Sequence, residues 1–242
     1  PWDLGKKGSR RAICASVNQK RSDMFTARFQ TVKHAIRRKS MGPDPKVRAK
    51  AKNHAAMDWR SLPAFYDSLR QRDATAAYAL RFTILTGART GETLGMVWEE
   101  MDFEARLWTV PAMRMKAENE HRVPLCDEAV EILSRMRDLQ SRYVFEGQKR
   151  HKPLSNMSMS MLLRRMDIQD ATVHGFRSTF RDWTSEVAKA PREVAELCLS
   201  HRIGNQVEQA YARSDLLEDR RRLMTRWGAF VAGETGKVVR LG

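Results

Sequence analysis

The sequence has few cysteines and no long apolar run. Its three cysteines, Cys14, Cys126 and Cys198, form no CxxC pair within the 242 residues. An odd number without such a pair is typical of reduced thiols in a cytoplasmic protein and argues against a disulfide framework. No apolar run approaches the roughly 18 residues of a transmembrane helix, and no signal-peptide pattern is present. We therefore expect no membrane span.

The short motifs that bind metals or nucleotides are missing as well. The sequence has no HExxH pair, no cluster of acidic ligands and no Walker loop. We therefore expect neither a metal site nor a cofactor. The chain begins with Pro1 instead of methionine, which we take as the mark of a fragment or a processed protein.

Positive charge is abundant and unevenly distributed. The 44 Lys and Arg against 29 Asp and Glu give a net charge of +15. Residues 1–60 hold 16 of the basic and only 4 of the acidic residues, so most of the surplus lies there. A strongly basic protein most often binds a polyanion, and nucleic acid is the commonest one. The basic segment predicts an arm or linker that follows DNA, with a solvated tail as the alternative.

Periodic patterns and turn residues predict how the chain is organised. Residues 41–45 (MGPDP) read as a linker, so we predict a basic segment over 1–52, a compact domain over 53–231 and a tail over 232–242. Helical spacing predicts helices over about 61–70, 73–85, 90–97, 127–139, 156–166, 173–188, 191–199 and 216–230, and a short one around Tyr211. Residues 106–110 and 120–125 alternate and predict a small antiparallel sheet.

Several helix ends carry the residues that such ends prefer. Ser61, Asp73 and Asp127 are placed to cap helices, and Pro191 suits a first turn. Near the C-terminus an apolar stripe is formed by Leu216, Leu217, Leu223 and Trp227. Two interpretations of this stripe are open, because it can pack on its own domain or dock on a neighbouring protomer.

Five polar residues form a set suited to phosphate chemistry. Arg89 lies at a glycine-marked turn in residues 86–92 (TGARTGE), and His174 and Arg177 share one helix face in the motif HGFR. His201 follows in LSH, and Tyr211 comes ten residues later. Guanidinium groups match nonbridging phosphate oxygens and stay charged. A hydroxyl can attack phosphorus when such groups stabilise the pentacoordinate phosphorane that forms.

In order and separation these motifs resemble the tyrosine recombinases, or phage-type integrases. The resemblance runs over about residues 53–227, and the stretches 193–196 (EVAE) and 213–217 (RSDLL) are most similar to the prophage and genomic-island branch. One departure is visible, since Ser200 stands where the family usually has glycine before its histidine. The resemblance implies a mainly α (α+β) fold, in which a helical catalytic domain carries a small three-stranded antiparallel sheet.

The resemblance also implies a role for each of the five residues. Tyr211 is expected to cleave DNA through a 3′-phosphotyrosyl intermediate, with Arg89 and Arg177 stabilising the phosphorane. His201 is expected to contact a nonbridging oxygen, and His174 to help receive the proton of the nucleophile. Their protonation states cannot be read from the sequence.

Two further residues complete the predicted site. The family places its general-acid lysine on the hairpin, where Lys116 lies in residues 113–118 (MRMKAE) with Arg114 as a nearby alternative. Glu92 follows Arg89 by three residues. It can orient that arginine, or serve as an ordinary acid in the first turn of a helix.

The function that the resemblance implies is site-specific recombination, the integration or excision of mobile DNA such as a prophage or a viral genome. The expected partner is double-stranded DNA at attachment sites. The expected assembly is a tetramer on DNA formed from free monomers, joined by accessory DNA-bending proteins, in a bacterial cytoplasm near the nucleoid.

Two alternatives stay open. A type IB topoisomerase-like nickase shares the same residue types. A truncated integrase that only binds DNA is the other, because residues 1–52 are too short for the complete core-binding domain that precedes this domain in the family and are at most its remnant.

Overall fold

The computed structural model describes residues 54–137, 141–201 and 215–234. They belong to the unit His54–Gly242, one of two into which the chain divides. The basic segment 1–52, Tyr211 with the helix expected around it, and residues 235–242 of the tail lie outside the described residues. The domain boundaries therefore stay predictions.

The described part is mainly helical, which confirms the expected fold class. Its α-helices are α2 (Leu62–Arg70), α3 (Thr75–Thr86), α4 (Thr90–Leu94), α5 (Asp127–Arg137), α6 (Ser158–Arg165), α7 (Gly175–Trp183), α8 (Arg192–Cys198) and α10 (Leu217–Val231). Short 3-10 turns cover Trp98–Glu100 and Ala112–Arg114, and a π turn at Thr184–Ala188 continues α7. Within the described residues no helix combines the length and the hydropathy that crossing a membrane requires.

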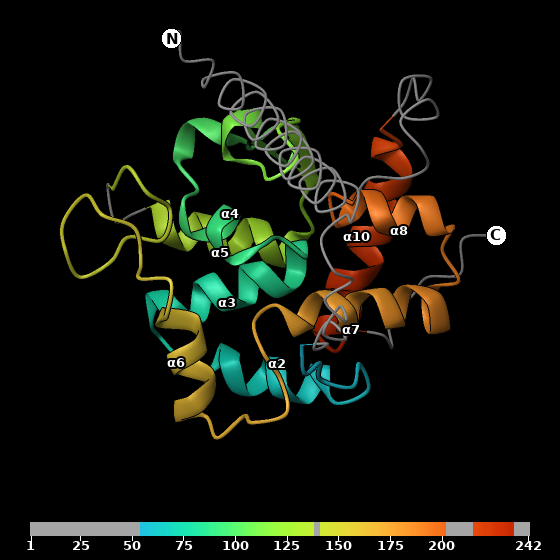
Figure 1. The fold of residues 1–242 in the computed structure, drawn as a ribbon, viewed down its shortest axis with the longest axis horizontal. Coiled ribbons are helices and arrows are strands. Elements are labelled where there is room, and N and C mark those ends of the chain that lie inside the picture. The colour runs from blue at the N-terminus through green and yellow to red at the C-terminus, as the bar shows by residue number, and fades with distance from the viewer. Residues whose placement is uncertain (1–53, 138–140, 202–214, 235–242) are drawn as a thin grey trace, which may run out of the picture. The chain divides into compact units, whose positions relative to one another are not determined.

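Helix α3 is the centre of the domain. Every residue from Ala77 to Thr86 is buried, which is the pattern of a helix enclosed on all sides. It packs against α2, α4, α5, α6 and α10. Figure 1 shows α6 on one side of α3, with α7, α8 and α10 grouped on the other. The turn at the end of α3 therefore lies where several helices can contribute side chains.

The sheet has three antiparallel strands in the order β1 (Met101–Asp102), β2 (Leu107–Val110) and β3 (His121–Pro124). Trp108 pairs with Val123 in the register of β2 and β3. The Trp108 side chain is fully buried, with its ring centroid 5.5 Å from that of Phe82 on α3. The alternating pattern predicts β2 and β3, whereas β1 is two residues long and too short to show an alternation.

Helix α10 is fastened to the core by aromatic side chains. Trp227 is fully buried, its Nε1 donates to the carbonyl of Ile84 at 2.9 Å, and its ring centroid lies 5.0 Å from that of Trp183. Leu223 is also buried, whereas Leu216 and Leu217 are half-buried. The apolar stripe thus packs mainly within its own domain, and docking on a neighbouring protomer is not needed to explain it.

Four predicted helix starts are wrong in detail, and one of them is Asp127, which is the first residue of α5 and not its cap. Ser61 is the N-cap residue of α2 but makes no side-chain capping bond, because its φ of −84° and ψ of −15° are helical and not the extended values of a capping residue. Asp73 accepts a hydrogen bond from the Tyr78 hydroxyl at 3.0 Å, and Ala74 is the N-cap of α3. Pro191 is the N-cap of α8 and not a first-turn residue.

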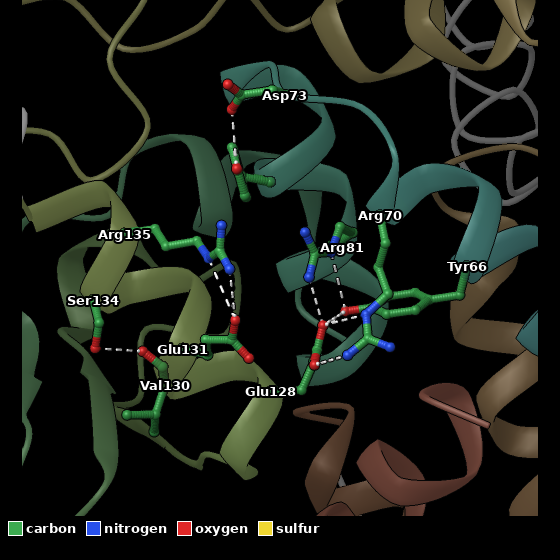
Figure 2. Close-up of polar contacts among 10 residues, drawn as sticks. Tyr66, Arg70, Asp73, Arg81, Glu128, Val130, Glu131, Ser134 and Arg135 are labelled. Atoms are coloured by element: carbon green, nitrogen blue, oxygen red, sulfur yellow. Dashed lines mark hydrogen bonds and ion pairs between the residues drawn. The ribbon is translucent and has the colours of Figure 1, made fainter. Parts of the chain in front are cut away.

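A buried ion-pair network joins α2, α3 and α5 (Figure 2). Glu128 accepts hydrogen bonds from Arg81 at 2.5 Å, from Arg70 at 2.7 Å and from the Tyr66 hydroxyl at 3.0 Å. Burial alone would raise the pKa of Glu128, but the bonds from Arg81 and Arg70 outweigh burial and lower it. Burial and the charge of Glu128 raise the pKa of Tyr66 far above its usual value, so it stays a neutral donor.

Glu128→Ala is expected to reduce the free energy of unfolding by about 3–5 kcal/mol, because removing one partner leaves the other charge buried and unpaired. The remaining charge is Arg81, which is 6% exposed. The matched control is Glu131→Ala on the same helix, whose carboxylate pairs with exposed Arg135 at 3.0 Å; its expected cost is about 0.3–0.5 kcal/mol. Urea unfolding measures both, and equal losses in the two variants would contradict the assignment.

Candidate active site

The turn after α3 presents Arg89. Gly87 ends the helix with a φ of +63°, a conformation that favours glycine, and its N–H donates to Thr83 at 3.0 Å. Glu92 is 5% exposed and accepts both the backbone N–H of Arg89, at 2.8 Å, and its Nη1, at 2.7 Å. One carboxylate therefore closes the first turn of α4 and holds the Arg89 guanidinium in place.

Arg177 connects three segments that are far apart in sequence. Its side chain is buried in the third position of α7. The guanidinium donates to the carbonyl of Gly87, to the carbonyl of Leu199 at 2.6 Å, and lies 3.1 Å from Nε2 of His201. The arginine turn, the start of α7 and the end of α8 therefore meet around one side chain.

The charges around Arg177 are poorly balanced. Burial and the nearby charge of Arg89 lower the pKa of Arg177 to about 10, with Glu92 acting in the opposite direction. Arg177 stays cationic at neutral pH, but its charged form is held at a free-energy cost. An anion bound by both guanidinium groups would remove that cost, so the arrangement favours an anionic ligand such as a phosphodiester.

His174 lies at the N-cap of α7, beside His54. The two ring centroids are 4.6 Å apart. Burial, followed by the charge of Arg177, lowers the pKa of His174, which keeps it neutral and able to accept a proton at neutral pH. Nothing in the sequence marks His54 as a neighbour of His174, because it precedes it by 120 residues.

The glycine of the HGFR motif has a packing role. A Cβ at position 175 would lie 1.9 Å from the carbonyl oxygen of Ala55. The same carbonyl accepts the backbone N–H of Thr172 at 3.0 Å. The segment that begins at His54 therefore crosses directly over the start of α7, and only glycine leaves room for it.

The end of α8 supplies His201 and an acidic neighbour that the motif analysis missed. His201 Nδ1 lies 2.5 Å from Oε2 of Glu196, whose Oε1 pairs with Arg181 at 2.7 Å. Glu196 comes five residues before His201 and reads as an ordinary solvated acid in the sequence. The one feature of the sequence that indicates this contact is the small residue Ser200 between the two, because a small residue allows the left-handed turn that ends α8.

Arg89, His174, Arg177 and His201 are thus brought together, and their electrostatic coupling appears in the lowered pKa of His174. Lys116 lies on the connection between β2 and β3 and is exposed. Arg114 is engaged elsewhere, since it pairs with Glu100 and donates to the carbonyl of Glu92 at 2.5 Å. Tyr211 lies outside the described residues, so the structure leaves its place in the site untested.

No cluster of three His, Cys, Asp or Glu side chains in the described ranges is arranged to hold a metal ion. The polar groups that converge at the site are cationic or neutral donors around Arg177. The two carboxylates, Glu92 and Glu196, are engaged by Arg89 and His201 respectively. Such a donor set fits an anion.

His121 on β3 is a further residue that the sequence did not single out. Burial and the charge of Arg220 lower its pKa to about 4, with Arg177 adding to the effect and Glu92 opposing it. His121 is therefore neutral at neutral pH. The charges of Arg220 and Arg177 act on it, so a further positive charge there would be unfavourable.

His121→Gln is expected to weaken the loss of stability in acid. Above about pH 6.5 a histidine is neutral in both the folded and the unfolded chain. Between pH 6.5 and 4 the unfolded chain binds a proton that the folded chain refuses, so stability falls. The variant should reduce this fall by up to about 3 kcal/mol. The measurement is urea unfolding at pH 7 and pH 4.5, with exposed His151→Gln as the control; identical pH dependence in wild type and His121→Gln would refute the assignment.

Comparison with known proteins places the chain in a family. Residues 56–217 match the phage integrase family. The prophage integrase IntA of Escherichia coli strain K12 is 33% identical over 195 residues, which cover 78% of this chain and 47% of IntA. The chain thus spans about half the length of the curated relatives it matches.

Two solved structures share the fold. The integrase from mycobacterium phage Brujita superposes with a TM-score of 0.53 at 16% identity, over 76% of this chain and 64% of that one. A lambda integrase tetramer bound to a Holliday junction gives a TM-score of 0.52 at 16% identity, over 77% of this chain and 56% of that one. With the helical fold, the small sheet and a family match over well more than half of its residues, the chain belongs to the phage integrase family.

Proposed function

We propose that this chain is the catalytic part of a site-specific recombinase that cleaves and rejoins DNA through a 3′-phosphotyrosyl intermediate at Tyr211. The observation that carries the proposal is the buried Arg177 beside Arg89, whose charge helps to lower the pKa of Arg177. Two fixed guanidinium groups, of which Arg89 alone pairs directly with a carboxylate of the described residues, suit one phosphodiester. The prophage integrase IntA and the lambda integrase structure support the same activity by their relationship.

The proposed reaction begins with attack of the Tyr211 oxygen on phosphorus. Neutral His174 takes the phenolic proton, and Arg89, Arg177 and His201 bind nonbridging oxygens of the phosphorane. The bond from phosphorus to the 5′ oxygen breaks, and Lys116 gives that oxygen a proton. A 5′ hydroxyl of another strand then attacks the phosphotyrosine and reverses each step, so the energy of the phosphodiester is kept and no nucleotide is consumed.

We further propose double-stranded DNA at attachment sites as the partner, with a tetramer of protomers on it. The lambda integrase tetramer bound to a Holliday junction is the support for this assembly. Residues 53–231 form the catalytic domain in this proposal, 232–242 a tail, and 1–52 a basic segment that adds nonspecific affinity for DNA. Accessory DNA-bending proteins and a location at the bacterial nucleoid belong to the same proposal. The topoisomerase alternative is not favoured, since the matched family is that of integrases.

Tyr211→Phe should retain DNA binding and lose a covalent adduct that wild type forms on a nicked suicide substrate carrying an attachment-site junction. Phenylalanine keeps the ring but has no oxygen to bond phosphorus. Denaturing electrophoresis measures the adduct, and Tyr143→Phe is the control for loss of another tyrosine. Adducts should form equally in EDTA, because the arginines supply the positive charge. An adduct that survives in Tyr211→Phe would remove the nucleophile assignment, and binding without any adduct in wild type would favour the DNA-binding remnant.

Lys116→Ala should slow cleavage by roughly 10²–10⁴-fold, the usual range for a general acid. An alkoxide leaves poorly without a proton, whereas a thiolate leaves readily. A bridging 5′-phosphorothiolate should therefore restore most of the rate to Lys116→Ala but not to Arg177→Ala, whose loss concerns charge stabilisation. The measurement is the single-turnover rate on both substrates; equal rescue of the two variants, or of neither, would show that Lys116 is not the acid.

A further inference from the structure

We propose that Glu196 is a positioning residue that fixes the tautomer and the orientation of His201, and through His201 the guanidinium of Arg177. The tautomer follows from the contacts of the protein alone. The catalytic consequence rests on the function proposed above.

The end of α8 brings the two residues together through its backbone. Ser200 has a φ of +52°, and its N–H donates to the carbonyl of Leu197 at 3.1 Å. The N–H of His201 reaches back to the carbonyl of Glu196 at 3.0 Å. This pair of bonds is the Schellman motif, which ends a helix with one left-handed residue. The outer bond joins Glu196 and His201, so their side chains lie close together. A left-handed residue other than glycine costs about 1–2 kcal/mol, so the presence of Ser200 means that surrounding contacts hold this turn.

The side chains repeat the contact that the backbone makes. Nδ1 of His201 lies 2.5 Å from Oε2 of Glu196, and the Glu196 side chain is 12% exposed. On the opposite edge of the ring, Nε2 lies 3.1 Å from Nη2 of Arg177. The imidazole is therefore held between a carboxylate and a guanidinium.

These two neighbours determine which ring nitrogen carries the proton. An ionised carboxylate only accepts hydrogen bonds, and a guanidinium only donates them. The hydrogen must therefore lie on Nδ1, towards Glu196, and the lone pair on Nε2, towards Arg177. This is the tautomer that a neutral histidine in water populates less, so the site selects it by its contacts.

The orientation of Arg177 depends on the same arrangement. Its Nη2 donates one hydrogen to the carbonyl of Leu199 at 2.6 Å and directs the other to His201. If Nε2 carried a hydrogen instead, it would face a donor, and the guanidinium would lose that contact. When a phosphate takes the place of Arg177 as the partner of Nε2, the contact of Nδ1 with Glu196 keeps the ring oriented towards it.

A simpler explanation is that Glu196 serves only its ion pair with Arg181. The two explanations differ in which variants move the tautomer. Arg181→Gln removes the ion pair and leaves the contact with His201. Glu193→Ala removes an exposed acid from the same helix and serves as the matched control for Glu196→Ala.

The first test uses the full chain with ¹⁵N-labelled histidine, free of DNA, at a pH at which the imidazoles are neutral. Long-range ¹H–¹⁵N correlation spectra should show His201 with its proton on Nδ1 in wild type, Arg181→Gln and Glu193→Ala. In Glu196→Ala the fraction of His201 protonated on Nε2 should rise, because Nδ1 loses its acceptor and only the donor Arg177 still favours the lone pair on Nε2. An Nε2 proton in wild type, or an unmoved Nδ1 proton in Glu196→Ala, would overturn the proposal whether or not the chain cleaves DNA.

The second test measures covalent adduct formation at saturating suicide substrate. Glu196→Ala should slow it by roughly 10–100-fold, as the loss of a partner that orients a metal-bound histidine does, with DNA affinity unchanged. Glu196→Gln keeps an acceptor for Nδ1 and should recover part of the rate. A wild-type rate in Glu196→Ala would contradict the positioning role. Absence of any adduct in wild type would instead reject the proposed function, and the spectra of the first test would still decide the tautomer.

Discussion

The candidate site depends on the burial of one guanidinium. Arg177 reaches the carbonyls of Gly87 and Leu199 and the ring of His201, so it fixes the turn after α3 against the end of α8. Each of these acceptors satisfies a donor that burial would otherwise leave unpaired. The same residue is proposed to bind the scissile phosphate. Structural and chemical demands therefore fall on one side chain.

The remaining polar groups of the site balance that charge without neutralising it. Glu92 accepts a hydrogen bond from the Arg89 guanidinium, and Glu196 contacts Nδ1 of His201 in the same way. Both carboxylates are largely buried, at 5% and 12% exposure. Each carboxylate orients a cationic or hydrogen-bond-donating side chain. Replacing either carboxylate by water would cost free energy, because the donor it holds would lose a charged acceptor. Neutral His121 and His174 keep the total positive charge from rising further.

The sequence predicted the elements whose hydrophobic pattern extends over several consecutive turns of one segment. Apolar spacing predicted several of the described helices, among them α5, α7 and α10, and the arginines and histidines of the motifs lie close together in the structure. Helix starts were less predictable, because the role of Ser61 depends on its own backbone angles, and that of Asp73 on the position of Tyr78. Glu196 and His121 were missed because an acid on a helix and a histidine on a strand look ordinary until the segments they face are known.

The contact between Gly175 and Ala55 restricts the side chain at one of the two positions but not at the other. Position 175 is restricted by side-chain volume, since a single Cβ would meet the opposing oxygen at 1.9 Å. Position 55 contributes only a main-chain carbonyl, which every amino acid provides. The tolerance to substitution is therefore asymmetric, with one partner held to a single residue type and the other free to vary as the upstream chain changes. Position 55 can therefore change without any change in the motif that carries His174.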